Sequence, residues 1–218
     1  MTIAEQEKAG KAFWKQAAEQ WPPPVFRSED YQGKLWWTLV IRPDEIISDT
    51  MLTVSSALRN RWPGLLYYPA ESYHVTVTNI GQVPEIRHYR EDIISSLKKA
   101  SQKLGKIDLH YATVNIGSSL VVQVFDQTGS MRSLVKKCLE NFQKEKIPAA
   151  QDVGPHVGLW WTVLARFTEE TPREIVRDIE RYEKLDFGRQ SVTSIELVET
   201  DKIFSDQNTE TIATIPLG

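Results

Sequence analysis

Two histidines stand in short strand-like segments whose residue types are suited to acid–base chemistry. One segment is His74–Val77 and the other is His156–Leu159. An imidazole has an unperturbed pKa of about 6.5, so near neutral pH one ring can accept a proton while another donates one. Displacement at a phosphodiester needs both transfers, one at the attacking oxygen and one at the leaving oxygen. We therefore take His74 and His156 as a candidate catalytic pair that works without a metal.

Alternation along a strand indicates which neighbours share the face of each histidine, because residues i and i+2 point the same way. In the first segment Thr76 and Thr78 follow His74 on one face, and a hydroxyl such as that of Thr76 can stabilise charge on a non-bridging phosphate oxygen. In the second segment Gly158 offers only its N–H and a close approach of the backbone.

The same alternation places Trp160 and Thr162 on the face of His156, and it turns Trp161 and Val163 toward the core. Aromatic rings near the two segments are candidates for stacking on a base or sugar. Trp160 is the first choice and Tyr73 is also a candidate, whereas Tyr67 and Tyr68 suit either the site or the core. The pair Trp36-Trp37 has one ring on each side of its strand, so one of them is a candidate for lining the site.

The elements that must position these residues occur twice along the chain. Each pass reads strand, helix, histidine strand, helix, strand; the expected ranges are 35–42, 44–61, 74–80, 85–104 and 107–116, then 120–125, 130–144, 156–164, 172–184 and 193–201. The histidine comes 39 residues after the start of its opening strand in the first pass (35 to 74) and 36 in the second (120 to 156). Such matched distances indicate an internal duplication.

The repeat predicts an α+β, bilobal, duplicated fold. Each of two pseudo-symmetric lobes would have a small, mainly antiparallel sheet covered by helices, with the active cleft between the lobes. Residues 1–33 form a separate N-terminal arm, a polar helix from Ile3 to about Trp21 that the three prolines 22–24 must end. Residues 34–218 form the domain, with lobes of about 34–117 and 118–218 whose interleaving is left open. Residues 211–217 would add an edge strand.

The segment His74–Val77 resembles the His-x-Thr/Ser-x signature of the two-histidine phosphoesterase superfamily. That superfamily includes bacterial RNA 2′,3′-cyclic phosphodiesterases once called 2′-5′ RNA ligases, plant cyclic phosphodiesterases and A-kinase-anchor-type domains. The resemblance covers residue 35 to the C-terminus and leaves the arm outside. It implies two catalytic histidines and, as substrate, a nucleotide or RNA-end phosphodiester. Gly158 departs from the signature, because it stands where the family has Thr or Ser.

Three alternatives remain open beside a metal-free phosphodiesterase. A catalytically weak or inactive module that binds a nucleotide or RNA end is made credible by Gly158. RNA 2′-5′ ligation is the reverse direction of the same chemistry. A zinc or manganese site from the two histidines with Asp152 or Glu71 is less favoured, because the ligands lack i, i+4 spacing. We expect no cofactor and no metal, and we expect His88 and His110 to be structural.

Composition sets the remaining limits. The 218 residues are 41% hydrophobic and 25% charged, with a net charge of −3 that argues against a protein that coats nucleic acid. The single cysteine, Cys138, excludes an intrachain disulfide and reads as a small buried hydrophobe on a helix. No apolar run reaches transmembrane length, and residues 1–8 lack a signal-peptide pattern. We therefore expect a cytoplasmic protein with no membrane attachment and no obligatory protein partner.

Overall fold

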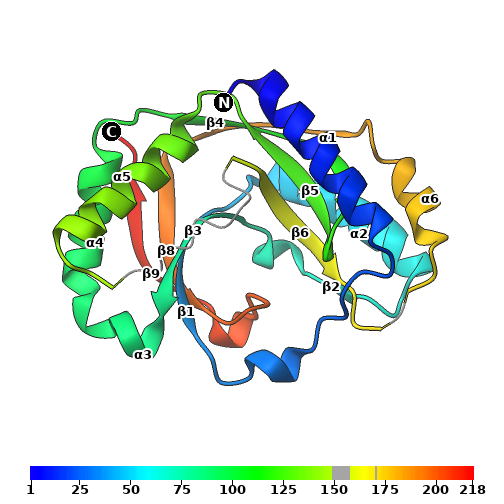
Figure 1. Ribbon diagram of the computed structural model, residues 1–218, viewed down its shortest axis with the longest axis horizontal. Coiled ribbons are helices and arrows are strands. Elements are labelled where there is room, and N and C mark those ends of the chain that lie inside the picture. The colour runs from blue at the N-terminus through cyan, green and yellow to red at the C-terminus, as the bar shows by residue number, and fades with distance from the viewer. Residues whose placement is uncertain (149–157, 170) are drawn as a thin grey trace.

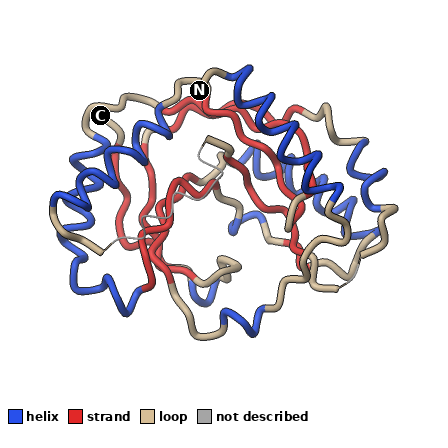
Figure 2. The backbone as a smooth tube through the Cα atoms, in the orientation of Figure 1, coloured by secondary structure: helices blue, strands red, loops and turns tan. Residues whose placement is uncertain are grey.

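A curled antiparallel sheet with helices around it forms the body of the protein (Figure 1). The computed structural model describes residues 1–148, 158–169 and 171–218. Figure 2 shows the strands arching from one side of the molecule to the other, with the helices outside them and the arm helix lying across the strands. Because every strand pair is antiparallel, the predicted α+β class with antiparallel pairing is confirmed.

The nine strands of the described residues are β1 (Trp36–Ile41), β2 (Leu66–Tyr67), β3 (Val75–Gln82), β4 (Ile107–Ile116), β5 (Ser119–Asp126), β6 (Trp160–Arg166), β7 (Asp186–Val192), β8 (Ser194–Thr200) and β9 (Glu210–Pro216). The α-helices of the same ranges are α1 (Ile3–Glu19), α2 (Glu45–Arg61), α3 (Val83–Ile86), α4 (Arg90–Ser101), α5 (Ser130–Lys144) and α6 (Ile175–Glu180). Short 3-10 turns complete them: η1 (Ser28–Tyr31), η2 (Ala70–Ser72), η3 (Arg87–Tyr89) and η4 (Asp206–Asn208).

The strand order is symmetric about the centre of the sheet. It runs β7-β4-β5-β6-β3-β1-β8-β9, with β2 beside β6. The two histidine strands, β3 and β6, meet at the middle through the pair Val75 and Thr162. The opening strands β1 and β5 flank them, and β8 and β4 come next. The two passes therefore share one continuous sheet in place of two separate small sheets, and β4 lies beside the strands of the second pass.

Helices that follow the predicted apolar stripes cover one face of this sheet. In α2, Ile47, Met51 and Leu58 are at most 2% exposed, and the Asp44 carboxylate caps the helix by accepting a hydrogen bond from the N–H of Ile47 (3.0 Å). In α5, Cys138 is fully buried, as expected. These residues join the large core between the helices and the sheet, so the face that carries the core is set by the stripes.

The arm helix α1 packs on the opposite face of the sheet. Gln6 and Trp14 are buried, and the Trp14 indole N–H donates to Gln123 Oε1 (3.1 Å). Gln123 is directly opposite Trp161 in the β5–β6 pair, so the two side chains share a face. We call this the site face, since it also carries the cavity described below.

Several element boundaries differ from the predicted ones. The expected helix 85–104 is broken into α3, η3 and α4, and the expected helix 172–184 shortens to α6. Strand β6 begins at Trp160 and extends to Arg166, and β2 and β7 were not expected at all. The edge strand near the C-terminus is confirmed as β9. Among the described residues, no helix is long and apolar enough to span a membrane.

Candidate functional site

A cavity of ≈ 800 Å³ opens on the site face where β3, β1 and β6 meet the arm. The structure brings His74, Thr76, Thr78 and Trp160 together in its lining. Tyr73 is only 1% exposed and belongs to the main core, so the structure does not bring it to this cavity. His156 and Asp152 lie outside the described residues, and their predicted roles stay predictions.

The orientation of His74 is fixed by its immediate neighbours. Its Nδ1 lies 2.8 Å from the carbonyl oxygen of Ser72, which can only accept, so Nδ1 carries the proton. In the neutral ring Nε2 is then the basic nitrogen, and no described residue hydrogen-bonds to it. The ring also stacks on Phe204, with centroids 3.5 Å apart and planes at 23°. His74 is thereby held in one tautomer and one plane.

Burial keeps this imidazole neutral. His74 is 7% exposed, and desolvation is the main reason that its pKa falls from 6.5 to about 3. The hydrogen bond to Ser72 opposes that fall, whereas the charges of Arg42 and Arg166 add to it. At neutral pH the ring is therefore a proton acceptor and not a proton donor.

Two irregularities of β3 bring consecutive residues into the cavity lining. In the β1–β3 pair, Leu39 lies opposite Thr78 and Val40 opposite Thr76, so Val77 has no partner on β1. Such a bulge re-aims the side chains next to it. As a result Thr76, Val77, Thr78 and Asn79 all line the cavity. The Thr78 hydroxyl donates to the Asn79 carbonyl (3.3 Å), whereas Thr76 is half-buried and has no hydrogen bond to a described residue.

The predicted face was wrong for three β6 side chains, those of Trp161, Thr162 and Val163. Thr162 is fully buried on the core side, whereas Trp161 and Val163 are half-buried and line the cavity. The reason is local, because Gly158 has φ +98° and stands in a turn ahead of the strand. Alternation counted from His156 therefore does not continue into β6. Trp160, at 8% exposure, contributes both to the core and to the cavity lining.

Gly158 is required by its backbone conformation. A positive φ of this size is strained for any residue with a Cβ. A Cβ at this position would also meet the end of the flexible Met1 side chain, which would have to shift. Gly158 stands where the two-histidine signature has Thr or Ser, and in this protein the first residue of the arm packs against it.

Three of the cavity residues that the sequence interpretation missed are two cations, Arg166 and Lys202, and the aromatic ring of Phe204. Arg166 at the end of β6 donates to the Tyr68 hydroxyl (2.7 Å), and Lys202 follows β8. Burial, and then the charge of Arg166, lower the pKa of Lys202. Phe204 is the third missed residue, with φ +54° and its carbonyl accepting from the Ser72 hydroxyl (2.8 Å). Of these three residues, only Arg166 could have been found from the sequence, because it is a cation at the end of an apolar strand.

The structure also places the other residues considered from the sequence. Trp36 lines the cavity and Trp37 is 1% exposed in the core, so the prediction of one ring on each side of the strand is confirmed. His110 lies 3.0 Å from the Asp186 carboxylate at Nε2, far along the chain from either motif. Within the described ranges, no group of three His, Cys, Asp or Glu side chains is placed to hold a metal.

Comparison with known proteins rests on structure alone, because no protein-family model and no curated protein matches the sequence. TT0787 of Thermus thermophilus superposes with a TM-score of 0.59 at 16% identity, over 84% of this chain and 97% of that one. E. coli LigT complexed with 3′-AMP gives 0.56 at 13% identity, over 84% and 98%. The chain has the LigT-type fold.

A third solved structure, the MHV ns2 PDE domain, extends this likeness. It superposes with a TM-score of 0.51 at 15% identity, over 76% of this chain and 97% of that domain. LigT, TT0787 and this domain are two-histidine phosphoesterases, so the resemblance stated from His74–Val77 is confirmed at the level of the fold. Nearly their whole length is matched, and about one-sixth of this chain lies outside the match with LigT.

Proposed function

We propose that this protein is a metal-independent phosphodiesterase that hydrolyses a 2′,3′-cyclic phosphate or a related small nucleotide or RNA-end phosphodiester. The observation that carries the proposal is His74, a neutral imidazole with Nδ1 bound to Ser72 and Nε2 unpaired among the described residues, beside the Thr76 hydroxyl. The LigT-type fold supports it, as does a solved LigT structure that holds 3′-AMP.

In the proposed reaction His74 is the general base and His156 the general acid. Water attacks phosphorus and gives its proton to His74 Nε2, while the bond from phosphorus to the leaving ribose oxygen breaks. His156 then supplies the proton that this oxygen needs. The assignment follows from the tautomer, since a buried neutral ring with a basic Nε2 accepts protons at neutral pH. Thr76 would donate to a non-bridging oxygen as charge builds.

The test combines variants with a chelator. His74→Asn and His156→Asn should each lower kcat on a nucleoside 2′,3′-cyclic phosphate by about 10²-fold or more, which is the usual size of acid–base contributions. His88→Asn, on η3 outside the cavity lining, is the matched control and should keep wild-type turnover. Activity should survive EDTA. Loss in EDTA with recovery in zinc or manganese would reject the metal-free mechanism, and full turnover in a His74 or His156 variant would reject its assigned role.

A second candidate is a nucleotide or RNA-end binding module without turnover. The specific observation in its favour is Gly158, which supplies no hydroxyl and cannot be exchanged for Thr without disturbing the turn. Calorimetric binding of a nucleoside monophosphate, with no product from any cyclic nucleotide, would select this candidate. Joining of tRNA halves would instead reveal RNA 2′-5′ ligation.

A further inference from the structure

The N-terminal arm forms one side of the cavity that holds His74. The lining residues from the arm fall within one short stretch, the arm segment 24–31: Pro24, Val25, Phe26, Arg27, Asp30 and Tyr31. Facing them are residues of β3, β1 and β6, including His74 and Thr76. The sequence set residues 1–33 apart from the duplicated domain, yet in the structure the site is not complete without them.

Hydrogen bonds at three places hold the arm against the domain. The Gln6 side chain makes two hydrogen bonds to the backbone of Asp126. Its Nε2 donates to the carbonyl oxygen (2.8 Å), and its Oε1 accepts from the N–H (3.0 Å). Trp14 donates to Gln123, and the Phe26 N–H donates to the carbonyl of Phe167 (2.6 Å). The arm segment is therefore preformed beside the cavity.

This segment carries planar rings next to cations. The rings of Phe26 and Tyr31 are stacked, 5.5 Å apart with planes at 7°, and Tyr31 meets the cavity-lining Trp36 at 6.2 Å and 60°. The Arg166 guanidinium lies 4.7 Å from the centroid of Phe26, and the Lys202 ammonium lies 5.7 Å from that of Tyr31. Aromatic faces beside cations are the surroundings that bind a nucleobase together with its phosphate.

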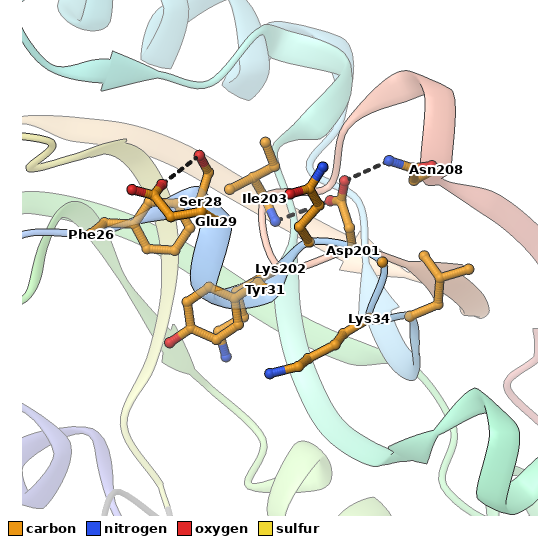
Figure 3. Close-up of a pocket in the computed structure, with 12 residues that line it drawn as sticks. Phe26, Ser28, Glu29, Tyr31, Lys34, Asp201, Lys202, Ile203 and Asn208 are labelled. Atoms are coloured by element: carbon orange, nitrogen blue, oxygen red, sulfur yellow. Dashed lines mark hydrogen bonds between the residues drawn. The ribbon is translucent and has the colours of Figure 1, made fainter.

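A second hollow of ≈ 430 Å³ adjoins the main cavity. It shares Phe26, Tyr31, Asp201 and Lys202 with the main cavity and adds polar groups such as Ser28 and Asn208. Figure 3 shows Tyr31 and Lys202 close together, with Asp201 held by Asn208 through the hydrogen bond drawn there. Tyr31 therefore borders both spaces.

We propose that the arm segment 24–31 is the nucleobase-recognition surface of the substrate site, with Tyr31 as its central ring. The inference rests on the proposed function, because it assumes that the phosphate lies at His74 and Thr76. It narrows the substrate to phosphodiesters that carry a nucleoside and fit a cavity the size of a typical small-ligand site. Stacking on a ring tolerates any base, so discrimination among bases should be weak.

The experiment measures binding and turnover for matched pairs of ligands that differ only in the base. Calorimetry uses 3′-AMP against the 3-phosphate of methyl riboside, which lacks the base, and kinetics uses the corresponding 2′,3′-cyclic phosphates. Wild type should bind 3′-AMP at least about fivefold more tightly than the base-free phosphate, since stacking on one ring is worth about 1–3 kcal/mol. Tyr31→Ala should remove most of that difference by weakening 3′-AMP alone, and Tyr31→Phe should keep it. Tyr89→Ala, a half-buried ring outside the cavity lining, is the control and should change neither Kd.

The outcomes separate this inference from the proposed function. Equal weakening of both ligands in Tyr31→Ala, or no change in either, would overturn the base-recognition role. If the wild type turns over the base-bearing and base-free cyclic phosphates with equal KM, the result supports the phosphodiesterase function and rejects the base-recognition surface. If no cyclic phosphate is turned over but Tyr31→Ala selectively weakens the binding of 3′-AMP, the result supports the base-recognition surface and rejects the hydrolytic function. A thermal melt of each variant checks that the half-buried Tyr31 was replaced without unfolding.

Discussion

The chemistry of the candidate site depends on one buried imidazole. The His74 ring is mostly shielded from solvent, makes one hydrogen bond at Nδ1 and stacks on Phe204. Desolvation disfavours the imidazolium form, so at neutral pH the ring is deprotonated before any ligand binds. A bound phosphodiester would bring negative charge close to Nε2 and would favour the protonated form once the proton has been transferred. Without such a ligand, burial and the charges of Arg42 and Arg166 keep the ring neutral.

The depressed pKa of His74 makes a prediction about stability. In the folded protein that pKa is about 3, whereas in the unfolded chain it is near 6.5. Between these values the unfolded state binds one more proton, so the free energy of unfolding rises with pH and levels off above about 6.5. One such group contributes a slope of about 1.4 kcal/mol per pH unit. Urea unfolding from pH 4.5 to 8 should show a shallower acid limb for His74→Gln than for wild type, and parallel curves would mean that His74 is solvated.

Gly158 leads to a second prediction about stability. Gly158→Ala places a Cβ at φ +98° and against Met1, so we expect a loss of about 1–3 kcal/mol in the free energy of unfolding. Gly129→Ala is the matched control, because Gly129 also has positive φ (+72°) but open space around it. Chemical denaturation should show the larger loss for Gly158→Ala. Equal losses would show that the contact with Met1 does not matter in solution.

Elements defined by their own residues were predictable from sequence. Helices α2 and α5 follow apolar stripes, and β1, β4 and β5 lie close to the expected ranges. Elements whose limits depend on tertiary contacts were not predictable from the sequence. The start of β6 is set by the turn at Gly158, and β2 exists through pairing with β6. The loop that brings Phe204 onto His74 is held by the Asp201 carboxylate, which accepts from backbone N–H groups of Ile203 and Ser205, a pattern without a distinct periodicity.

This loop after β8 carries the third prediction. Phe204→Ala removes the ring that covers His74, so water regains access and the pKa of His74 should rise toward 6.5. NMR titration of the imidazole measures this directly, and the acid limb of kcat/KM should move to higher pH with it. Ile203→Ala, the half-buried neighbour, is the control and should leave the titration unchanged. A pKa that stays low in Phe204→Ala would assign the desolvation to β3 and β6 instead.

For the whole molecule, net charge and cavity size limit the kind of ligand that the protein suits. With a net charge of −3 and a cavity of ≈ 800 Å³, the protein is suited to a small ligand and not to tracking along a polynucleotide. An RNA of about 20 nucleotides with a 3′-phosphate should therefore bind within a few-fold of 3′-AMP, because few phosphates would be neutralised. Calorimetry at about 50 and 200 mM salt measures this, and a steep salt dependence that grows with RNA length would contradict it.

The mirrored strand order has a consequence for how this protein can fold and evolve. Strand β4 comes from the first half of the sequence yet pairs with β5 and β7, and β8 comes from the second half yet pairs with β1. A chain cut in the tight β4–β5 connection near Gly117 would leave two fragments that each lack an inner strand of their own half-sheet. Each fragment would expose an unpaired edge that only its counterpart fills. The two halves of the sequence therefore depend on each other for a complete sheet.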